Sequence, residues 1–231
     1  MIKNSRDFKQ VPMLFVEGNV GVGKTTFLKI LQQALDVHVF LEPTELWENV
    51  EGHNFLKTFF LDQKRWAYSF QQYVLITRID QMLQADTVWA DKVGLVERSI
   101  YSGRYCFARV AHAIGTMNDL EWSLYIKQWD RENIRIQRPP AGFIYLRTPA
   151  DVCFERMAQR GRAAEKTATL DYIKKIETYY DAWFFEKKDI DQDLARVPVL
   201  TLDFAVNILE DIATQQNYVN QVRRFIETLQ G

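Results

Sequence analysis

Eight residues beginning at Gly18 read Gly-Asn-Val-Gly-Val-Gly-Lys-Thr and match the phosphate-loop pattern Gly-x4-Gly-Lys-Thr without a mismatch. An apolar run of strand length, 13–17, precedes them, and a helix-forming stretch, 26–35, follows. Between a strand and a helix, such a loop lets backbone N–H groups converge on phosphate oxygens at the helix N-terminus. The alternative, an ordinary glycine turn before a helix, is the weaker interpretation. The loop therefore predicts nucleoside triphosphate binding, with Lys24 reaching the outer phosphates and Thr25 holding Mg²⁺.

Two glutamates follow further apolar runs: Glu42 comes after 37–41 and Glu97 after 94–96. Ligands of parallel α/β sheets bind beyond the carboxyl ends of the strands, so both carboxylates are expected to face the loop. Glu42 could accept a proton from an attacking hydroxyl, or it could be a solvated glutamate that opens a loop. Glu97 could bind Mg²⁺ directly or through water, and Arg98 could span a phosphoryl group and its acceptor; the alternative is an ion pair between neighbouring strands.

A basic cluster, Arg156, Arg160 and Arg162, precedes Glu165. Arg156 and Arg160 are four residues apart and share a helix face, and Gly161 suggests that the helix loosens there into a mobile segment. Three cations in a chain of net charge −1 need anions, and phosphates would supply them. Such clamps contribute about 10³–10⁵ to phosphoryl-transfer rates, against about 10²–10⁴ for a general base. We therefore expect these arginines and Mg²⁺ to carry more of the catalysis than Glu42; the alternative is a solvated basic helix face.

Five short apolar runs are separated by longer helical stretches, which is typical of a parallel sheet covered on both faces. The predicted fold class is α/β, with a phosphate loop, five parallel strands and helices on both faces, in a single domain of residues 1–231 with a short N-terminal tail of residues 1–11. The expected strands are 13–17, 37–41, 94–96, 142–146 and 197–202, and the expected helices are 25–35, 45–60, 64–85, 103–113, 118–136, 150–161, 169–188 and 206–229.

The bulk composition narrows the function classes. The 231 residues are 47% hydrophobic with a net charge of −1, which argues against nucleic acid or an anionic membrane as a partner. Cys106 and Cys153 fall in apolar helical patterns, which favours buried thiols in a reducing compartment. The tail is too short and too acidic for an organelle-targeting peptide, so a cytoplasmic location is expected. Asp91-x-x-Gly94 matches a GTPase switch, but it precedes its strand and no Asn-Lys-x-Asp follows, so a GTPase is excluded.

Together these features resemble the cellular deoxynucleoside kinase family, which includes deoxycytidine, deoxyguanosine and mitochondrial thymidine kinases and the broad-specificity insect enzyme. The similar segments keep the family's order and run from about residue 13 to residue 204. They are Glu42-Pro-Thr-Glu-Leu-Trp47, Trp66-Ala-Tyr-Ser-Phe-Gln71 with Tyr73 and Arg78, Glu97-Arg-Ser-Ile-Tyr-Ser102 with Arg104-Tyr-Cys-Phe107, and Arg160-Gly-Arg162 with Glu165.

The resemblance implies that ATP, with Mg²⁺, donates its γ-phosphoryl group to the 5′-hydroxyl of a deoxyribonucleoside, and that two helices of each subunit form a homodimer bundle. It implies the fold of a P-loop kinase and makes Glu42 the base, Arg98 the link to the phosphates and Glu97, with Thr25, the magnesium ligand. In the same way it makes Arg156, Arg160 and Arg162 a mobile arginine lid. Gln71 would read the base edge, because one amide offers a donor and an acceptor. The implied catalytic residues are Glu42, Arg98, Lys24, Arg156, Arg160 and Arg162. The nucleotide contacts are Gly18, Asn19, Val20, Gly21, Val22, Gly23, Lys24, Thr25, Thr26, Arg160, Asp203 and Phe204. The substrate contacts are Glu42, Trp47, Phe60, Phe70, Gln71, Val74, Arg78, Arg98, Gly103, Phe107 and Glu165, of which the aromatic side chains could otherwise be plain core.

The chain departs from the family at positions that select the substrate. Gly103 stands where an Asp usually neutralises Arg78, so an unpaired Arg78 would favour bases with carbonyl acceptors and predicts broad or keto-leaning specificity. Another carboxylate, such as Glu48 or Asp80, could still reach Arg78. Phe60 stands where a Tyr usually helps hold the sugar 3′-hydroxyl, which predicts weaker discrimination against 3′-deoxy analogues.

Two other functions stay open. A thymidylate-type nucleoside monophosphate kinase shares the fold but needs a cation beside Glu42, where the sequence reads Glu42-Pro-Thr-Glu45 and indicates an acidic neighbourhood. A non-catalytic structural subunit should have lost Lys24, Glu42 or Arg98, and all three are present.

Overall fold

A computed structural model of the chain describes residues 11–88, 92–135 and 139–230. Apart from residue 11, the predicted N-terminal tail of residues 1–11 lies outside the described residues. No helix in the described ranges is long and apolar enough to cross a membrane.

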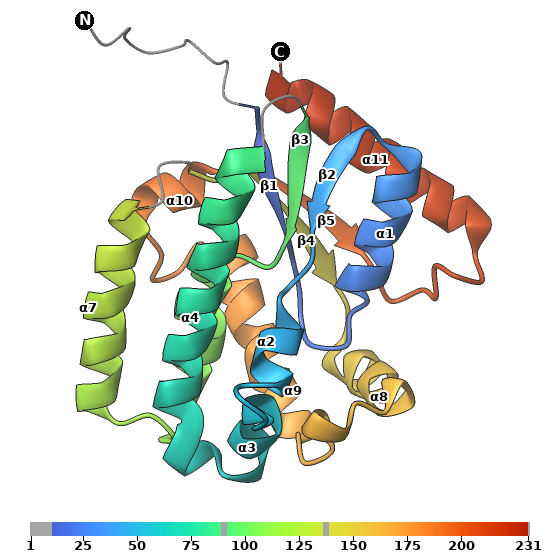
Figure 1. The fold of residues 1–231 in the computed structure, drawn as a ribbon. Coiled ribbons are helices and arrows are strands. Elements are labelled where there is room, and N and C mark those ends of the chain that lie inside the picture. Colours follow the sequence, from blue (N-terminus) through green and yellow to red (C-terminus); the bar gives the residue numbers. More distant parts are fainter. Residues whose placement is uncertain (1–10, 89–91, 136–138, 231) are drawn as a thin grey trace, which may run out of the picture.

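The described part of the chain builds a five-stranded, all-parallel sheet in the order β2-β3-β1-β4-β5 (Figure 1). Each of the five apolar runs forms a strand within two residues of its expected ends, which confirms the predicted sheet. The strands are β1 (Met13–Glu17), β2 (Val37–Phe40), β3 (Val93–Glu97), β4 (Gly142–Arg147) and β5 (Val199–Asp203).

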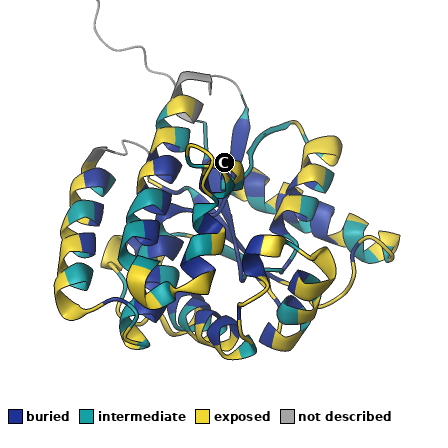
Figure 2. Cartoon of the chain, turned by 60° about the horizontal axis from the view of Figure 1, so that its bottom comes forward, coloured by how far each residue is buried: buried dark blue, intermediate teal, exposed yellow. Residues whose placement is uncertain are grey.

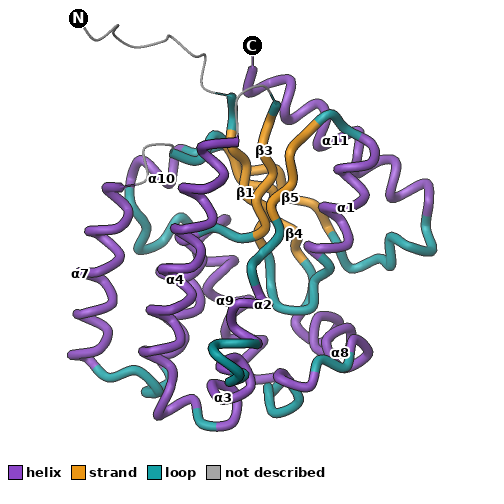
Figure 3. Tube along the Cα trace, viewed as in Figure 1, coloured by secondary structure: helices purple, strands orange, loops and turns teal. Residues whose placement is uncertain are grey.

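Helices cover both faces of this sheet (Figures 1 and 3), as the alternation of strands and helices predicts. Helices α1 (Lys24–Ala34) and α11 (Ile212–Gln230) lie on one face. The other face carries α4 (Gln63–Val88), α7 (Asp119–Arg135) and α9 (Leu170–Asp181). The shorter elements are α2 (Thr44–Glu48), α3 (Phe55–Leu61), α5 (Ile100–Ser102), the π-helical turns η1 (Gly103–Phe107) and η3 (Ala182–Glu186), α6 (Ala108–Ala113), α8 (Ala150–Arg160), the 3₁₀ turn η2 (Ala163–Glu165) and α10 (Gln192–Arg196).

The core lies on both sides of the central strands. Every residue of β1 and β3 is buried, as expected where helices cover both faces of a parallel sheet (Figure 2). Buried apolar side chains from Met13 to Ile226 form one hydrophobic cluster. The order β2-β3-β1-β4-β5 places the ends of β1, β2 and β3 side by side, so Glu17, Glu42 and Glu97 gather near one end of the sheet.

Two predicted helices have other bounds and one helix was not predicted, in each case because of a local capping residue. The stretch 45–60 breaks into α2 and α3, where the Asn54 side chain accepts a hydrogen bond from Lys57 N at 2.8 Å and begins α3. Asp211 caps Thr214 N at 2.9 Å, so α11 begins at Ile212 rather than 206. Asp191 caps α10, a helix that the sequence did not predict.

Candidate active site

The glycine-rich loop between β1 and α1 has the backbone that its sequence predicts. Gly18, Gly21 and Gly23 have φ values of +148°, +82° and +107°, which residues with a side chain rarely adopt. A Cβ at Gly21 would lie 2.2 Å from the backbone oxygen of Cys153 on α8, so only glycine fits there. Lys24 is buried at the start of α1, and its Nζ donates to the carbonyls of Asn19 at 2.9 Å and Gly18 at 3.3 Å. Burial, followed by the charge of Arg98, lowers the pKa of Lys24 to about 8.

Thr25 and Glu97 form the expected oxygen pair beside this loop. The Thr25 hydroxyl lies 2.8 Å from one Glu97 carboxylate oxygen and 3.0 Å from the other. Hydroxyl and carboxylate oxygens are hard ligands, and Mg²⁺ commonly takes one or two protein oxygens and completes its shell with phosphates and water. The donor set therefore fits a magnesium ion that also touches a bound triphosphate.

Glu42 follows β2 and lies between two arginines. Its Oε1 accepts a hydrogen bond from Arg78 Nη2 on α4 and forms an ion pair with Arg98 Nε at 3.1 Å. Burial alone would raise the pKa of Glu42, but Arg98, Arg78 and Lys24 outweigh it and lower this pKa to about 2. The carboxylate is therefore ionised throughout the physiological pH range and is a weak base.

The expectation that Arg78 is unpaired was wrong. The carboxylate that reaches it is Glu42, whereas Glu48 lies 3.1 Å from Arg162 and Asp80 is exposed. A carboxylate does reach Arg78, as the sequence left open, but it is neither Glu48 nor Asp80 and lies 36 residues away in the chain. Arg78 Nη1 also donates to the Ser99 carbonyl at 3.3 Å.

Gly103 lies beside Arg78, but the Tyr125 hydroxyl already fills the adjoining space. A Cβ at Gly103 would lie 3.8 Å from Arg78 Nη1 and 2.9 Å from the Tyr125 hydroxyl. Any larger side chain at position 103 would therefore need Tyr125 on α7 to move.

Arg98 connects Glu42 with the phosphate loop. Its backbone φ is +66°, uncommon for a non-glycine residue, and its guanidinium is buried. Nη1 donates to the Gly18 carbonyl at 3.1 Å and to the Tyr180 hydroxyl at 2.7 Å, while the Phe107 ring centroid lies 4.5 Å from Cζ. Burial disfavours the charge, but Tyr180, Glu42 and Glu17 outweigh it and hold the pKa of Arg98 above its ordinary value.

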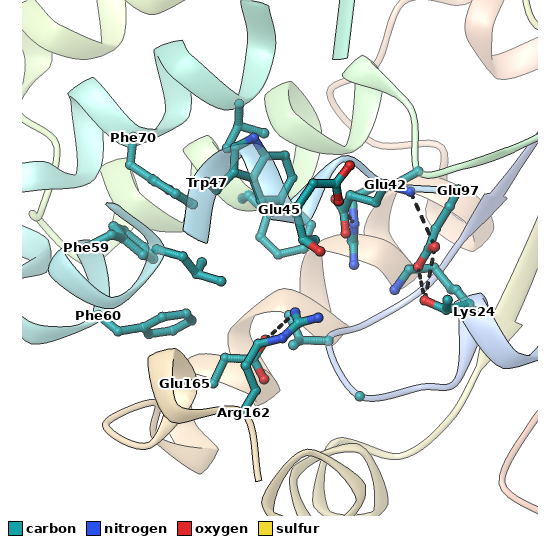
Figure 4. A pocket seen from close by; sticks show the side chains of 18 of the residues that line it. Lys24, Glu42, Glu45, Trp47, Phe59, Phe60, Phe70, Glu97, Arg162 and Glu165 are labelled. Atoms are coloured by element: carbon teal, nitrogen blue, oxygen red, sulfur yellow. Dashed lines mark hydrogen bonds and ion pairs between the residues drawn. The ribbon is translucent and has the colours of Figure 1, made fainter. Parts of the chain in front are cut away.

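Glu42 divides a cavity of about 250 Å³ into a polar end and an aromatic end (Figure 4). Lys24 and Glu97 lie at the polar end, and Phe59, Phe60, Phe70 and Trp47 line the other. Gln71 is buried and lines the same cavity. The cavity unites most predicted substrate contacts: Glu42, Trp47, Phe60, Phe70, Gln71, Val74, Arg78, Arg98, Phe107 and Glu165.

The sequence missed several residues of this cavity. Phe59 stacks on Phe70 with ring centroids 4.5 Å apart, so both phenylalanines of the 59–60 pair line the wall. Tyr172 lines it from α9 and meets Phe60 edge-on at 6.2 Å. An aromatic residue on a helix has the same sequence signal whether it faces core or cavity, so spacing could not single out Tyr172.

The three arginines near α8, which were expected to find their anions in phosphates, already have partners in the protein. Arg156 donates to the backbone carbonyls of Val22, Phe204, Ala205 and Val206 at 2.7–3.1 Å. Glu165 accepts from Arg160 at 2.5 Å and from Arg162 at 3.1 Å. Arg160 and Arg162 still line the cavity with Glu165, opposite Glu42 and Lys24 (Figure 4), and their role as a mobile lid stays a prediction.

A second cavity, of about 750 Å³, adjoins the first one and shares Lys24, Thr25 and Glu97 with it. Its lining includes Gly21–Thr26, Arg156, Arg160 and Phe204. Asp203 was expected to contact the nucleotide, but it ends β5 and does not line this cavity. Asn19 was also expected as a nucleotide contact, and its amide donates to the Ile173 carbonyl at 2.9 Å.

Comparisons with known proteins agree with this geometry. The family model described as "Deoxynucleoside kinase" matches residues 14–227. The mitochondrial deoxyguanosine kinase of Xenopus laevis is 32% identical over 95% of this chain and 91% of that protein. A probable deoxycytidine kinase of fowlpox virus is 32% identical over 93% and 88%, and human mitochondrial thymidine kinase 2 is 34% identical over 75% and 64%.

Proposed function

The chain belongs to the deoxynucleoside kinase family, and from that premise we propose that it transfers the γ-phosphoryl group of ATP to the 5′-hydroxyl of deoxyribonucleosides, as one domain of residues 1–231 acting in nucleotide salvage. The observation that carries the proposal is the position of Glu42. This carboxylate lies in one cavity with Lys24 and Thr25 on its polar side and with Gln71 and Phe70 on its aromatic side. A nucleoside seated on the aromatic side would point its 5′-hydroxyl at Glu42 and the triphosphate.

Each of these residues has a distinct task in this reaction. Glu42 accepts a hydrogen bond from the 5′-hydroxyl and aligns it with the γ-phosphorus, and it takes the proton as the new bond forms. Phosphoryl transfer depends mostly on positioning and charge stabilisation, so a carboxylate of low pKa suffices. Arg98 spans Glu42 and the phosphate loop, and Lys24 holds the outer phosphates. Magnesium, held by Thr25 and Glu97, would neutralise phosphate charge.

A four-substrate assay tests the proposal. ADP release with ATP, Mg²⁺ and each of the four deoxynucleosides should show turnover with at least one of them, with thymidine or deoxyguanosine turned over at least as well as deoxyadenosine. Thymidylate in place of the nucleoside is the matched control and should give little turnover. Turnover with thymidylate alone would favour the monophosphate kinase, and none with any acceptor would favour a non-catalytic subunit.

The broad or keto-leaning specificity depends on a competition between Glu42 and the base carbonyls for Arg78, because Arg78 is paired rather than free. Guanine and thymine present carbonyl oxygens, which can accept from an arginine that otherwise donates to Glu42. Moving Arg78 to the base removes one cation from Glu42 and makes it a stronger base. Base preference should therefore emerge in kcat as well as in KM, which the same panel measures.

The monophosphate kinase alternative must be judged on the geometry rather than on the acidic sequence around Glu42. The expectation of an acidic neighbourhood was wrong, because Arg78 and Arg98 both lie against Glu42. Both arginines are engaged by that carboxylate, however, and an acceptor phosphate would have to compete with Glu42 for them. This competition favours an uncharged acceptor hydroxyl.

Triphosphate binding should take up a proton at mildly alkaline pH. The pKa of Lys24 is lowered to about 8, so the amine is partly neutral there, and nearby phosphates would raise that pKa and restore the charge. We expect an uptake of about half a proton per triphosphate at pH 8 and almost none at pH 6.5. Calorimetry in two buffers of different ionisation enthalpy, with the magnesium complex, measures it. Lys24→Arg is the control, because arginine stays charged and should abolish the uptake; equal uptake in both proteins would contradict the assignment.

A homodimer through α4 and α7 is part of the same proposal. These helices pack side by side on one face of the sheet (Figure 1). Ile76 on α4 and Leu120 and Leu124 on α7 leave large apolar side chains exposed. Exposed apolar side chains on adjacent helices support a bundle with a second copy of the chain.

A further inference from the structure

The carboxylate of Glu17, the last residue of β1, is completely buried next to the site without lining its cavity. Its Oε1 accepts from the backbone N of Ser99 at 2.7 Å and from the Ser99 hydroxyl at 2.6 Å, and its Oε2 accepts from the Tyr180 hydroxyl at 2.9 Å. A buried carboxylate with three donors is fully satisfied and its direction is fixed. Through Ser99, Glu17 holds the backbone immediately after Arg98.

The Tyr180 hydroxyl joins this carboxylate to Arg98. It donates to Glu17 and accepts from Arg98 Nη1 at 2.7 Å. Its ring is completely buried on α9 and stacks on Tyr145, with ring centroids 5.7 Å apart, and on Trp183 at 6.1 Å. Burial raises the pKa of Tyr180 well above its ordinary value, so the hydroxyl keeps its proton and continues to donate to Glu17.

Arg98 needs such support, because it follows β3 in a left-handed backbone conformation. An arginine side chain has several staggered rotamers, and the contacts of its guanidinium select one of them. Two acceptors share Nη1: the Gly18 carbonyl, which belongs to the phosphate loop, and the Tyr180 hydroxyl, which the core fixes. Tyr180 is thus the contact that ties Arg98 to the core rather than to the loop.

We propose that Tyr180 is a positioning residue for phosphoryl transfer: together with Glu17 it holds the Arg98 guanidinium between the phosphate loop and Glu42. The proposal rests on the function proposed above. Tyr180 touches neither substrate; it acts through Arg98, whose placement sets both the alignment of the transferring group and the charge at Glu42. The Glu17 carboxylate polarises the hydroxyl, which strengthens its acceptance from the guanidinium.

Removing one hydroxyl tests the proposal. In Tyr180→Phe, kcat should fall by about 10–100-fold, the range for one hydrogen bond to a charged group, while KM for the nucleoside and Kd for the triphosphate stay within about threefold. Tyr145→Phe is the matched control, because it deletes a neighbouring buried hydroxyl that bonds Asp181 at 3.0 Å and not Arg98. Its kcat should stay within about threefold of wild type. Nucleoside-binding stoichiometry, measured by calorimetry, corrects kcat for any unfolded fraction.

The pH profile separates positioning from a general loss of stability. Arg98, Arg78 and Lys24 act on the Glu42 carboxylate, and Arg98 lowers its pKa the most, whereas Glu97 accepts from the Glu42 backbone N at 3.4 Å. If Arg98 moves away in Tyr180→Phe, the pKa of Glu42 rises toward its ordinary value, and kcat/KM falls below about pH 5 where the wild type stays level. Destabilisation alone would leave the shape of the profile unchanged after correction for stoichiometry.

Several outcomes would overturn the proposal. They are a Tyr180→Phe kcat close to wild type, an equal loss in Tyr145→Phe, or an unchanged acid limb. If Tyr180→Phe does not fold, Glu17→Gln replaces it; it keeps an acceptor for Ser99 but removes the charge behind Tyr180, and it should show the same kcat loss and acid limb. A wild-type enzyme that phosphorylates no deoxynucleoside overturns the proposed function and this inference together, whereas an active wild type with an unaffected Tyr180→Phe overturns this inference alone.

Discussion

Replacing Arg98 with lysine should lower kcat by about 10³–10⁵-fold, the range for loss of a phosphoryl-clamping arginine. Lysine keeps the positive charge but has no planar fork, so it cannot donate to Glu42, the Gly18 carbonyl and Tyr180 at once. The effect should fall on kcat more than on the KM for either substrate, because the guanidinium acts most strongly as the phosphoryl group transfers. Steady-state ADP release with both substrates varied measures the split.

Arg104→Lys is a suitable control for that experiment. Arg104 also pairs with a carboxylate, Asp130 at 2.5 Å, and its Cζ lies 4.5 Å from the centroid of the Trp129 ring, as that of Arg98 does from Phe107. It lines a different cavity, away from the phosphate loop. A kcat near wild type for Arg104→Lys with a collapse for Arg98→Lys assigns the loss to the site. Similar losses of kcat in both variants would mean that replacing a carboxylate-paired arginine with lysine is generally harmful, and would contradict a role for Arg98 in phosphoryl transfer.

Glu42→Gln should lower kcat by about 10²–10⁴-fold while triphosphate binding is retained. The amide keeps the size of the carboxylate but cannot take the proton of the acceptor hydroxyl, and it leaves Arg78 and Arg98 without their shared anion. Binding of the triphosphate depends on the loop and Lys24, which the change does not touch. In the wild type the pKa of about 2 predicts that Glu42 causes no acid limb between pH 5 and 8, because the group is ionised throughout.

Glu45→Gln provides the comparison for Glu42. Glu45 lines the same cavity three residues further along the chain (Figure 4). Its loss should change kcat by less than about tenfold, because it lies outside the arginine pair that holds Glu42. Unchanged turnover in Glu42→Gln, with nucleotide binding intact, would refute Glu42 as the base.

The parts of this structure that were predictable are those encoded over short stretches of chain. Apolar runs and a glycine loop with correct flanks define β1, the loop and α1, because their conformations depend on neighbours in sequence. The ends of β2 and β3 then place Glu42 and Glu97 near that loop, because parallel strands end at the same edge of the sheet.

Side-chain partners across the fold were not predictable in this way. Whether Arg78 meets Glu42 depends on the rotation of α4 about its own axis, which packing over its whole length decides. The link from Glu17 to Tyr180 spans 163 residues, and Arg156 bonds backbone carbonyls, which carry no sequence signal. Helix ends at Asn54, Asp191 and Asp211 depended on single capping residues that also occur in ordinary loops.

The tight approach of Gly21 to Cys153 has a mechanical consequence. Gly21 contacts α8 at Cys153, and Arg156 of the same helix donates to the carbonyls of Val22 and Phe204. The part of α8 from Cys153 to Arg156 must therefore move with the phosphate loop as a rigid body. Gly161, whose φ of +66° ends α8, separates Arg160 at the end of this helix from Arg162, so a rotation at Gly161 would carry Arg162 and leave Arg160 on the helix. A residue with a side chain at position 161 should therefore change the mobility of Arg162 without changing the conformation of the phosphate loop.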